Sequence, residues 1–143
     1  MDIFTTMKIS ASALKAQRIR MNAISSNLAN IETTRTPDGG PYRKREVVFQ
    51  SSQSGFADTL DNRLRDAVQG VKVAHVQASS LPPLMVYNPS HPDANAQGLV
   101  AMPNINLVEE TADMMSASRA YEANVTVVKS AKRMALKALE IGR

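Results

Sequence analysis

Apolar residues recur at intervals of seven in a stretch near the start of the chain. Seven residues make close to two turns of an α-helix, so residues at this spacing lie on one side of it. The main row of this stretch is Met7, Leu14, Met21 and Leu28, and a companion row holds Ile3, Ile24 and Ile31. The pattern predicts a helix from about residue 3 to about residue 30.

A second stretch with the same interval occupies the last third of the chain. Its main row is Leu107, Met114, Tyr121, Val128 and Ala135, flanked by Ala117, Val125, Ala131, Ala138 and Leu139. Asn106 stands where a helix N-cap is expected, acidic residues follow it, and basic residues close the segment, which suits the helix dipole. A second helix is therefore predicted, beginning after Asn106.

The shared interval predicts that the two helices pair along a coiled-coil-like seam. On the N-terminal helix the predicted assembly seam is Met7, Leu14, Met21, Ile24, Leu28 and Ile31. On the C-terminal helix it is Leu107, Met114, Tyr121, Val125, Val128 and Leu139. The predicted fold is mainly α, a hairpin of two long terminal helices with a small β-rich insert between them.

The centre of the chain has a different composition. All seven prolines and five of the six glycines lie between residues 37 and 103. Because an interior proline costs a helix about 3 kcal/mol, this distribution divides the chain into a helix over 1–31, an irregular or β-rich region over 32–104 and a helix over 105–143. Short apolar or alternating runs predict strands at 45–49, 71–78, 84–87 and 99–102. Apolar residues every four positions predict a short helix or ordered loop over 56–68.

Composition narrows the chemistry of the chain. It has 143 residues and no cysteine, which excludes disulfides, cysteine-ligated zinc and thiol nucleophiles. Its two histidines, His75 and His91, have no serine or aspartate at the spacing of a known nucleophile motif and are interpreted as surface or turn residues. We therefore expect no catalytic residue, no cofactor and no metal site, and a protein that is not an enzyme.

One acidic and amide-rich segment resembles half of a calcium loop. Asp93, Asn95 and Gln97 alternate before Gly98, but the loop's twelfth position, which requires a bidentate glutamate, is Asn104. A tight turn closed by asparagine or aspartate side chains explains the same residues, so we predict a turn here.

The net charge is +4, and much of the positive excess lies near the start of the chain. The basic residues there are Lys8, Lys15, Arg18 and Arg20, and the acidic residue is Asp2. A basic helical protein that binds nucleic acid is therefore one alternative. No apolar run approaches the roughly 20 residues that span a bilayer, and polar residues interrupt any secretory signal near the start. We expect no membrane span, and export only by a route without a cleavable signal.

Several motifs resemble one family. Residues 26–30 (Ser-Asn-Leu-Ala-Asn), followed by threonines at 33 and 34, are similar to the N-terminal signature of bacterial flagellar rod and hook proteins. Residues 37–43, 47–50, 87–94, 98–100, 102–106 and 115–125 resemble the proximal-rod members of that family in order and spacing. The turn that carries the family motif is Asn27, Ala29, Asn30 and Thr33. Residues 51–69 match no signature, and Leu99 stands where the family often has tyrosine.

The resemblance implies a structural subunit of the flagellar basal body. Terminal helices of many subunits would pack into the rod, the drive shaft that transmits motor torque across the periplasm. The implied partners are further copies of the chain, other proteins of the proximal and distal rod, the adaptor protein that links the rod to the membrane ring, and the flagellar type III export apparatus. Nucleic acid is not among them. Another structural protein exported by a type III apparatus is the remaining alternative.

The two predicted helices carry apolar and small residues over more surface than one partner helix covers. We therefore expect both arms to order fully only when they pack against neighbouring chains.

Overall fold

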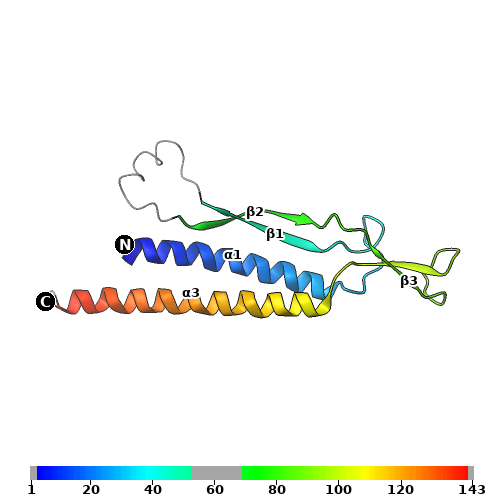
Figure 1. Ribbon diagram of the computed structural model, residues 1–143. Coiled ribbons are helices and arrows are strands. Elements are labelled where there is room, and N and C mark those ends of the chain that lie inside the picture. Colours follow the sequence, from blue (N-terminus) through cyan, green and yellow to red (C-terminus); the bar gives the residue numbers. More distant parts are fainter. Residues whose placement is uncertain (1–2, 53–68, 142–143) are drawn as a thin grey trace.

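The computed structural model describes residues 3–52 and 69–141. Two long helices, α1 (Ile3–Ala29) and α3 (Leu107–Ile141), lie side by side and antiparallel, so that the start of α1 and the end of α3 lie toward the same end of the molecule (Figure 1). The prediction of two long terminal helices around a small β-rich insert is confirmed. The helix or ordered loop predicted over 56–68 lies outside the described residues.

The strands form two separate antiparallel pairs. β1 (Arg45–Ser51) pairs with β2 (Val71–Ala78), with an irregularity between Val48 and Phe49, and β3 (Leu84–Tyr87) pairs with β4 (Leu99–Met102). All four predicted strands are confirmed, and β1 continues two residues further than the prediction.

Helix α1 lies between α3 and the β1–β2 ribbon (Figure 1). The Oγ atom of Ser12 accepts a hydrogen bond from the backbone N–H of Val71 at 3.2 Å, which fixes the start of β2 on α1. Gly70 permits this approach, because a Cβ atom there would lie 2.8 Å from Ser12 Oγ. The β3–β4 hairpin extends beyond the helices at the end opposite the start of α1 (Figure 1).

The buried apolar residues are mostly small. They are Ala16, Ala23 and Ile24 of α1, Ala117 and Ala131 of α3, and Val100 and Ile105 of the segment that leads into α3. Alanine at the contact lets two helices approach closely, but it buries little area for each residue. The chain therefore has a thin core spread along its length.

Polar side chains end and begin the elements as the sequence indicates. Asn106 caps α3, because its Oδ1 accepts the N–H of Val108 at 3.0 Å. In the turn before β4, Asn95 Oδ1 accepts the N–H groups of Gln97 and Leu99, both at 2.9 Å, and Gly98 takes a φ of 75°. The predicted tight turn is confirmed. None of the helices described is long and apolar enough to cross a membrane.

Candidate functional site

One buried asparagine joins three elements of the fold. Asn27, in the last turn of α1, is 1% exposed. Its Oδ1 accepts the N–H of Arg45 at 2.8 Å and the hydroxyl of Tyr42 at 3.1 Å. Its Nδ2 donates to the carbonyl of Arg45 and to Oε2 of Glu110, each at 3.0 Å. All four hydrogen-bonding positions of the amide are filled, so this side chain ties the end of α1 to the starts of β1 and α3.

Tyr42 extends this network to the helix surface. A phenol has one hydrogen, and that of Tyr42 goes to Asn27. The Oγ atom of Ser26, which lies 3.1 Å from the Tyr42 hydroxyl, therefore donates to it. We call Asn27, Tyr42, Lys44, Arg45 and Glu110 the Asn27 junction.

Glu110 brings a buried charge into the Asn27 junction. This residue is 1% exposed, and its Oε1 lies 2.8 Å from Nζ of Lys44. The hydrogen bond to Glu110 raises the pKa of Lys44 above 10.5, an effect that partial burial opposes and that the nearby carboxylates of Glu110, Glu46 and Glu109 reinforce. A buried carboxylate that has both a cation and an amide as partners is stable in place, and removing either partner is costly. The network therefore holds the end of α1 to the start of β1 and the start of α3.

The predicted family-motif turn supports the junction. Asn30 Nδ2 donates to the carbonyl of Ser26 at 2.8 Å, and Thr33 Oγ1 donates to Asn30 Oδ1 at 3.2 Å. The carbonyl of Thr33 accepts the N–H of Tyr42 at 3.0 Å, which sets the phenol against Asn27. Of the four predicted turn residues, Asn27 is buried, Asn30 and Thr33 are half-buried, and Ala29 is exposed.

The predicted seam residues differ in how far they are buried. Ile24 is buried. The half-buried positions are Met7, Leu14, Met21, Leu28 and Ile31 on the N-terminal side and Met114, Tyr121, Val125 and Val128 on α3. Leu107 and Leu139 are 57% and 72% exposed. Apart from Ile24, the larger side chains of the predicted seam therefore keep surface that a second chain can cover.

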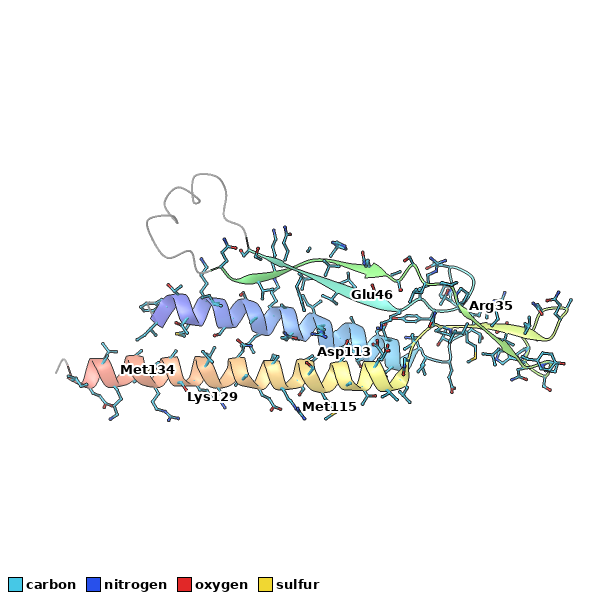
Figure 2. All side chains as sticks on the ribbon, viewed as in Figure 1. Arg35, Glu46, Asp113, Met115, Lys129 and Met134 are labelled. Atoms are coloured by element: carbon cyan, nitrogen blue, oxygen red, sulfur yellow. The ribbon has the colours of Figure 1, made fainter. Side chains whose placement is uncertain are left out.

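Further apolar side chains of α3 are exposed. They are Val108, Met115, Val127, Met134, Leu136 and Ile141. Met115 and Lys129 lie on the side of α3 that faces away from α1 (Figure 2). Exposed apolar residues along a helix mark a surface for another protein more often than a catalytic surface.

Sequence reasoning missed the roles of Glu110 and Lys44. It interpreted Glu110 as an acid that suits the helix dipole. The signal was present, because Glu110 occupies the same seven-residue row as Ala117 and Ala131 and is therefore a charge on the contact side of α3. No sequence pattern points to Lys44 or Tyr42 as its neighbours.

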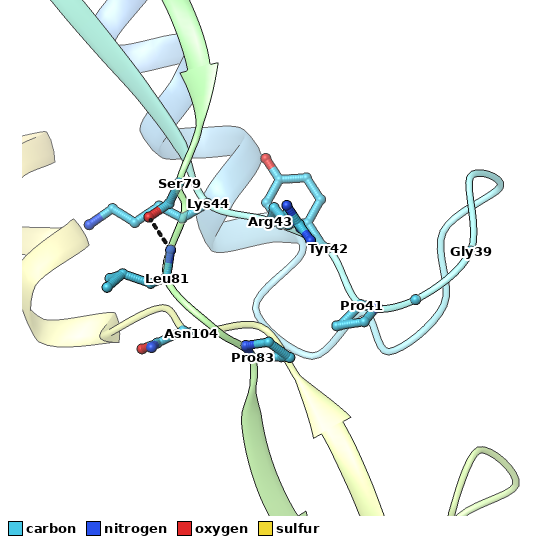
Figure 3. Close-up of a pocket in the computed structure, with 10 residues that line it drawn as sticks. Gly39, Pro41, Tyr42, Arg43, Lys44, Ser79, Leu81, Pro83 and Asn104 are labelled. Carbon is cyan, nitrogen blue, oxygen red and sulfur yellow. Dashed lines mark hydrogen bonds between the residues drawn. The ribbon is translucent and has the colours of Figure 1, made fainter.

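The pocket at the root of the β3–β4 hairpin offers no catalytic chemistry. It has a volume of about 120 Å³ and lies between the loop over 39–44, the segment from Ser79 to Pro83, and Asn104 (Figure 3). The N–H of Leu81 donates to Ser79 Oγ at 3.4 Å across one wall (Figure 3). Its charged lining residues are Arg43 and Lys44, without a carboxylate or histidine. Ligand pockets ordinarily have ~300–1,000 Å³, so this one is too small for a cofactor. Among the residues described, no group of three or more His, Cys, Asp or Glu side chains is placed to hold a metal ion.

Comparison with known proteins gives a consistent result. A family model described as "Flagella basal body rod protein" matches residues 7–35, and one described as "Flagellar basal body rod FlgEFG protein C-terminal" matches residues 96–141. The chain is 43% identical over 152 residues to the flagellar basal-body rod protein FlgC of Borreliella burgdorferi, covering 99% of this chain and 98% of that protein. It is 43% identical to the protein of the same name from Bacillus subtilis and 44% identical to that from Escherichia coli O157:H7, with both chains covered completely. The chain belongs to the FlgC family.

Each of the two matched segments contributes one residue to the Asn27 junction. The first covers most of α1 and the turn that holds Asn27, and the second covers β4 and α3 with Glu110. FlgC proteins are structural proteins of the flagellar rod and not enzymes. Membership does not favour the nucleic-acid alternative.

Proposed function

We propose that this chain is a subunit of the proximal rod of the flagellar basal body, and that it assembles through α1 and α3. Assembly of many copies and related subunits gives the shaft that transmits motor torque across the periplasm. One observation carries the proposal: the buried apolar residues of the two paired helices are mostly alanines, and larger apolar side chains, among them Leu107 and Leu139, are open to solvent. In a tube each helix has several neighbours, and these side chains become buried.

The seam predicted from the seven-residue interval is part of this proposal. Seam residues such as Leu28 and Val128 are half-buried, so a third helix can cover the surface that they keep. On this view residues 1–31 and 105–143 form the axial core and residues 32–104 form a lobe that joins neighbours laterally. Contacts that repeat between copies without closing produce a helical assembly.

The proposed partners are those that membership of the family suggests. They are further copies of this chain, other proteins of the proximal and distal rod, the adaptor protein that links rod and membrane ring, and the flagellar type III export apparatus. The chain would reach the periplasmic rod through that apparatus without a cleavable signal. Full-length similarity to FlgC rod proteins supports this placement.

The test uses charges placed at the proposed seam. Leu28→Asp and Val128→Asp put an unpaired carboxylate where helices meet, which costs several kcal/mol when it is buried. Each variant should abolish swimming when it replaces the wild-type protein in a motile strain, while the protein level stays normal on an immunoblot. Isolated basal bodies should lack the variant.

Exposed positions on the same helices provide matched controls. Ser25→Asp on α1 and Thr126→Asp on α3 introduce the same charge at exposed residues outside the predicted seam and should leave swimming largely intact. Normal motility of both seam variants would contradict assembly through these helices.

A further inference from the structure

Three arginine side chains line one open groove of the molecule. The groove lies between the end of α1, the loop over 33–41, the start of β1 and the last residues of β2, and it has a volume of about 840 Å³. Arg35 belongs to the loop, Arg45 begins β1, and Arg43 precedes it by two residues. All three are exposed, and Arg35 lies beyond the end of α1, on the side of the β3–β4 hairpin (Figure 2). We call this space the arginine groove.

The guanidinium groups of the arginine groove have no partner within the described part of the chain. None of the ion pairs between described residues includes Arg35, Arg43 or Arg45. The hydrogen bonds of Arg45 come from its backbone N–H and carbonyl, not from its side chain. One acidic residue, Asp38, lines the groove, so the lining keeps an excess of positive charge. Each guanidinium also keeps five N–H donors for another molecule.

Strand geometry explains why Lys44 is paired and its two neighbours are not. The carbonyl of Lys44 accepts the N–H of Ser79 at 2.7 Å, which continues the pairing of β1 with β2. Successive residues of such an extended chain point to opposite sides. Lys44 contacts Glu110 on one side, at 2.8 Å, and Arg43 and Arg45 lie on the other side, where both line the groove.

The backbone that carries these arginines is fixed by hydrogen bonds. The side chain of Asn27 holds both the N–H and the carbonyl of Arg45, at 2.8 and 3.0 Å. The N–H of Tyr42 donates to the carbonyl of Thr33 at 3.0 Å, which closes the loop that contains Arg35. A surface whose backbone is already ordered loses less conformational entropy when a partner binds. The arginine groove is therefore prepared for binding in the free chain.

Carboxylates and phosphates both pair with guanidinium groups, so the other features of the groove decide between them. Surfaces for single-stranded nucleic acid usually add aromatic rings on which bases stack. Tyr42 is the aromatic residue of the lining, and its half-buried hydroxyl is hydrogen-bonded to Asn27 and Ser26. The volume lies in the upper part of the ~300–1,000 Å³ range of ligand sites, which exceeds what one small anion fills. These features favour a peptide segment with several carboxylates.

We propose that the arginine groove binds an acidic segment of a partner protein, whose Asp or Glu carboxylates pair with Arg35, Arg43 and Arg45. Arginine suits this role because its planar group donates two parallel hydrogen bonds to one carboxylate. The groove is separate from the predicted seam of α1 and α3, so the contact goes beyond the proposed packing of helices. It requires no assembled rod and is tested on the isolated chain. Failure of this test leaves assembly through the helices unaffected, and failure of the seam test leaves the groove unaffected.

Fluorescein-labelled hexaglutamate is the probe. Its fluorescence anisotropy is measured while the full-length chain is added at about 50 mM salt, where screening is weak. The wild-type chain should bind the probe saturably, and unlabelled hexaglutamate but not hexaglutamine should displace it. Combining Arg35→Gln, Arg43→Gln and Arg45→Gln should weaken binding about tenfold. The circular dichroism spectrum should stay unchanged, because all three side chains are exposed.

A matched control removes the same charge elsewhere. Lys129→Gln, Lys132→Gln and Arg133→Gln, combined in one protein, neutralise three exposed cations of α3 and should weaken binding less than about twofold. Equal losses in the two triple variants would overturn the proposal, because the probe would then follow net charge alone. Absence of binding to the wild-type chain would also overturn it.

An oligonucleotide with six phosphates and the same label distinguishes the two kinds of anion. It should bind the wild-type chain less tightly than hexaglutamate does, because the groove offers no free aromatic ring for stacking. Tighter binding of the oligonucleotide, lost in the triple variant of the groove, would overturn the proposal and assign the groove to nucleic acid.

Discussion

The side chain of Asn27 is buried and makes all four of its hydrogen bonds, so shortening it should destabilise the fold. Asn27→Ala leaves the Arg45 backbone groups, the Tyr42 hydroxyl and one Glu110 oxygen without their partner. Each unsatisfied buried group costs about 1–3 kcal/mol, partly relieved by water that enters the gap. We expect the free energy of unfolding to fall by about 3 kcal/mol, measured by urea denaturation followed by circular dichroism.

Asn22 offers a matched control on the same helix. It is exposed, so Asn22→Ala removes no buried hydrogen bond and should change the free energy of unfolding by about 0.5 kcal/mol or less, in the stabilising direction. Equal effects of the two substitutions would show that the Asn27 junction contributes little.

At Gln17, unlike at Asn27, we expect the removal of a polar side-chain atom to stabilise the fold. Its Oε1 atom is buried and has no hydrogen-bond partner among the described residues. Methionine has nearly the same shape without the polar atom, so Gln17→Met should raise the free energy of unfolding by about 1 kcal/mol. The same exchange at the exposed Gln50 should have no such effect. A loss of stability in Gln17→Met would mean that this oxygen has a partner in solution.

The raised pKa of Lys44 predicts how the free energy of unfolding depends on pH. Its pKa in the folded protein lies above 10.5, chiefly because of its hydrogen bond to Glu110. A cation with a raised pKa stabilises the fold fully below its unfolded pKa, and this stabilisation disappears as the pH rises through the folded pKa. The free energy of unfolding should therefore decrease between about pH 10 and about pH 12.

An arginine at position 44 separates this effect from other alkaline titrations. Guanidinium stays protonated throughout the range, so Lys44→Arg should lose less stability than the wild-type protein between the same two pH values. Parallel curves for the two proteins, from urea titrations at each pH, would show that Lys44 does not cause the alkaline loss of stability.

At the scale of elements, the Asn27 junction favours one register of α1 against α3. The contact side of α3 repeats small residues, with Ala117 and Ala131 in the same row as Glu110. Sliding α1 by seven residues, about 10 Å, would again place a small residue opposite Asn27. Only the register that brings Glu110 to Asn27 satisfies both side chains, as buried polar residues do in coiled coils.

Glu110→Ala should therefore broaden the register. With spin labels at Ser25→Cys and Glu122→Cys, both exposed, the wild-type background should give one distance distribution and Glu110→Ala a wider one with a component shifted by several ångströms. Asp113→Ala removes the surface pair between Arg20 and Asp113 and should leave the distribution unchanged. A single unshifted distribution in Glu110→Ala would mean that packing alone sets the register.

The difference between local patterns and contacts of distant residues explains what the sequence could predict. Helices and strands follow from patterns within a few residues, and the seven-residue rows, the cap at Asn106 and the prolines placed them correctly. Asn27 could be singled out from its motif, but its bond to Glu110 joins residues 83 positions apart. The pairing of the strands and the position of Lys44 depend on contacts of that kind. No local pattern contains them, because they arise only when separate elements pack together.

At the scale of the whole molecule, an extended shape with a thin core leaves its two ends poorly protected. Helix α3 continues past α1, and its last turns carry Leu136, Leu139 and Ile141 in solvent. Without tertiary contacts a terminal helical segment frays, because its hydrogen bonds are open to water. The expectation that the arms order fully only among neighbouring chains applies most strongly here.

Hydrogen exchange of dilute and assembled protein tests this expectation. In dilute protein, amides over 135–141 should exchange at least tenfold faster than those around Ala117, where α1 covers α3. In purified basal bodies the difference should largely disappear, because neighbouring subunits then cover the last turns of α3. Full protection of 135–141 in the dilute chain would show that this helix is stable alone, and that its exposed side chains do not require a partner to hold it in shape.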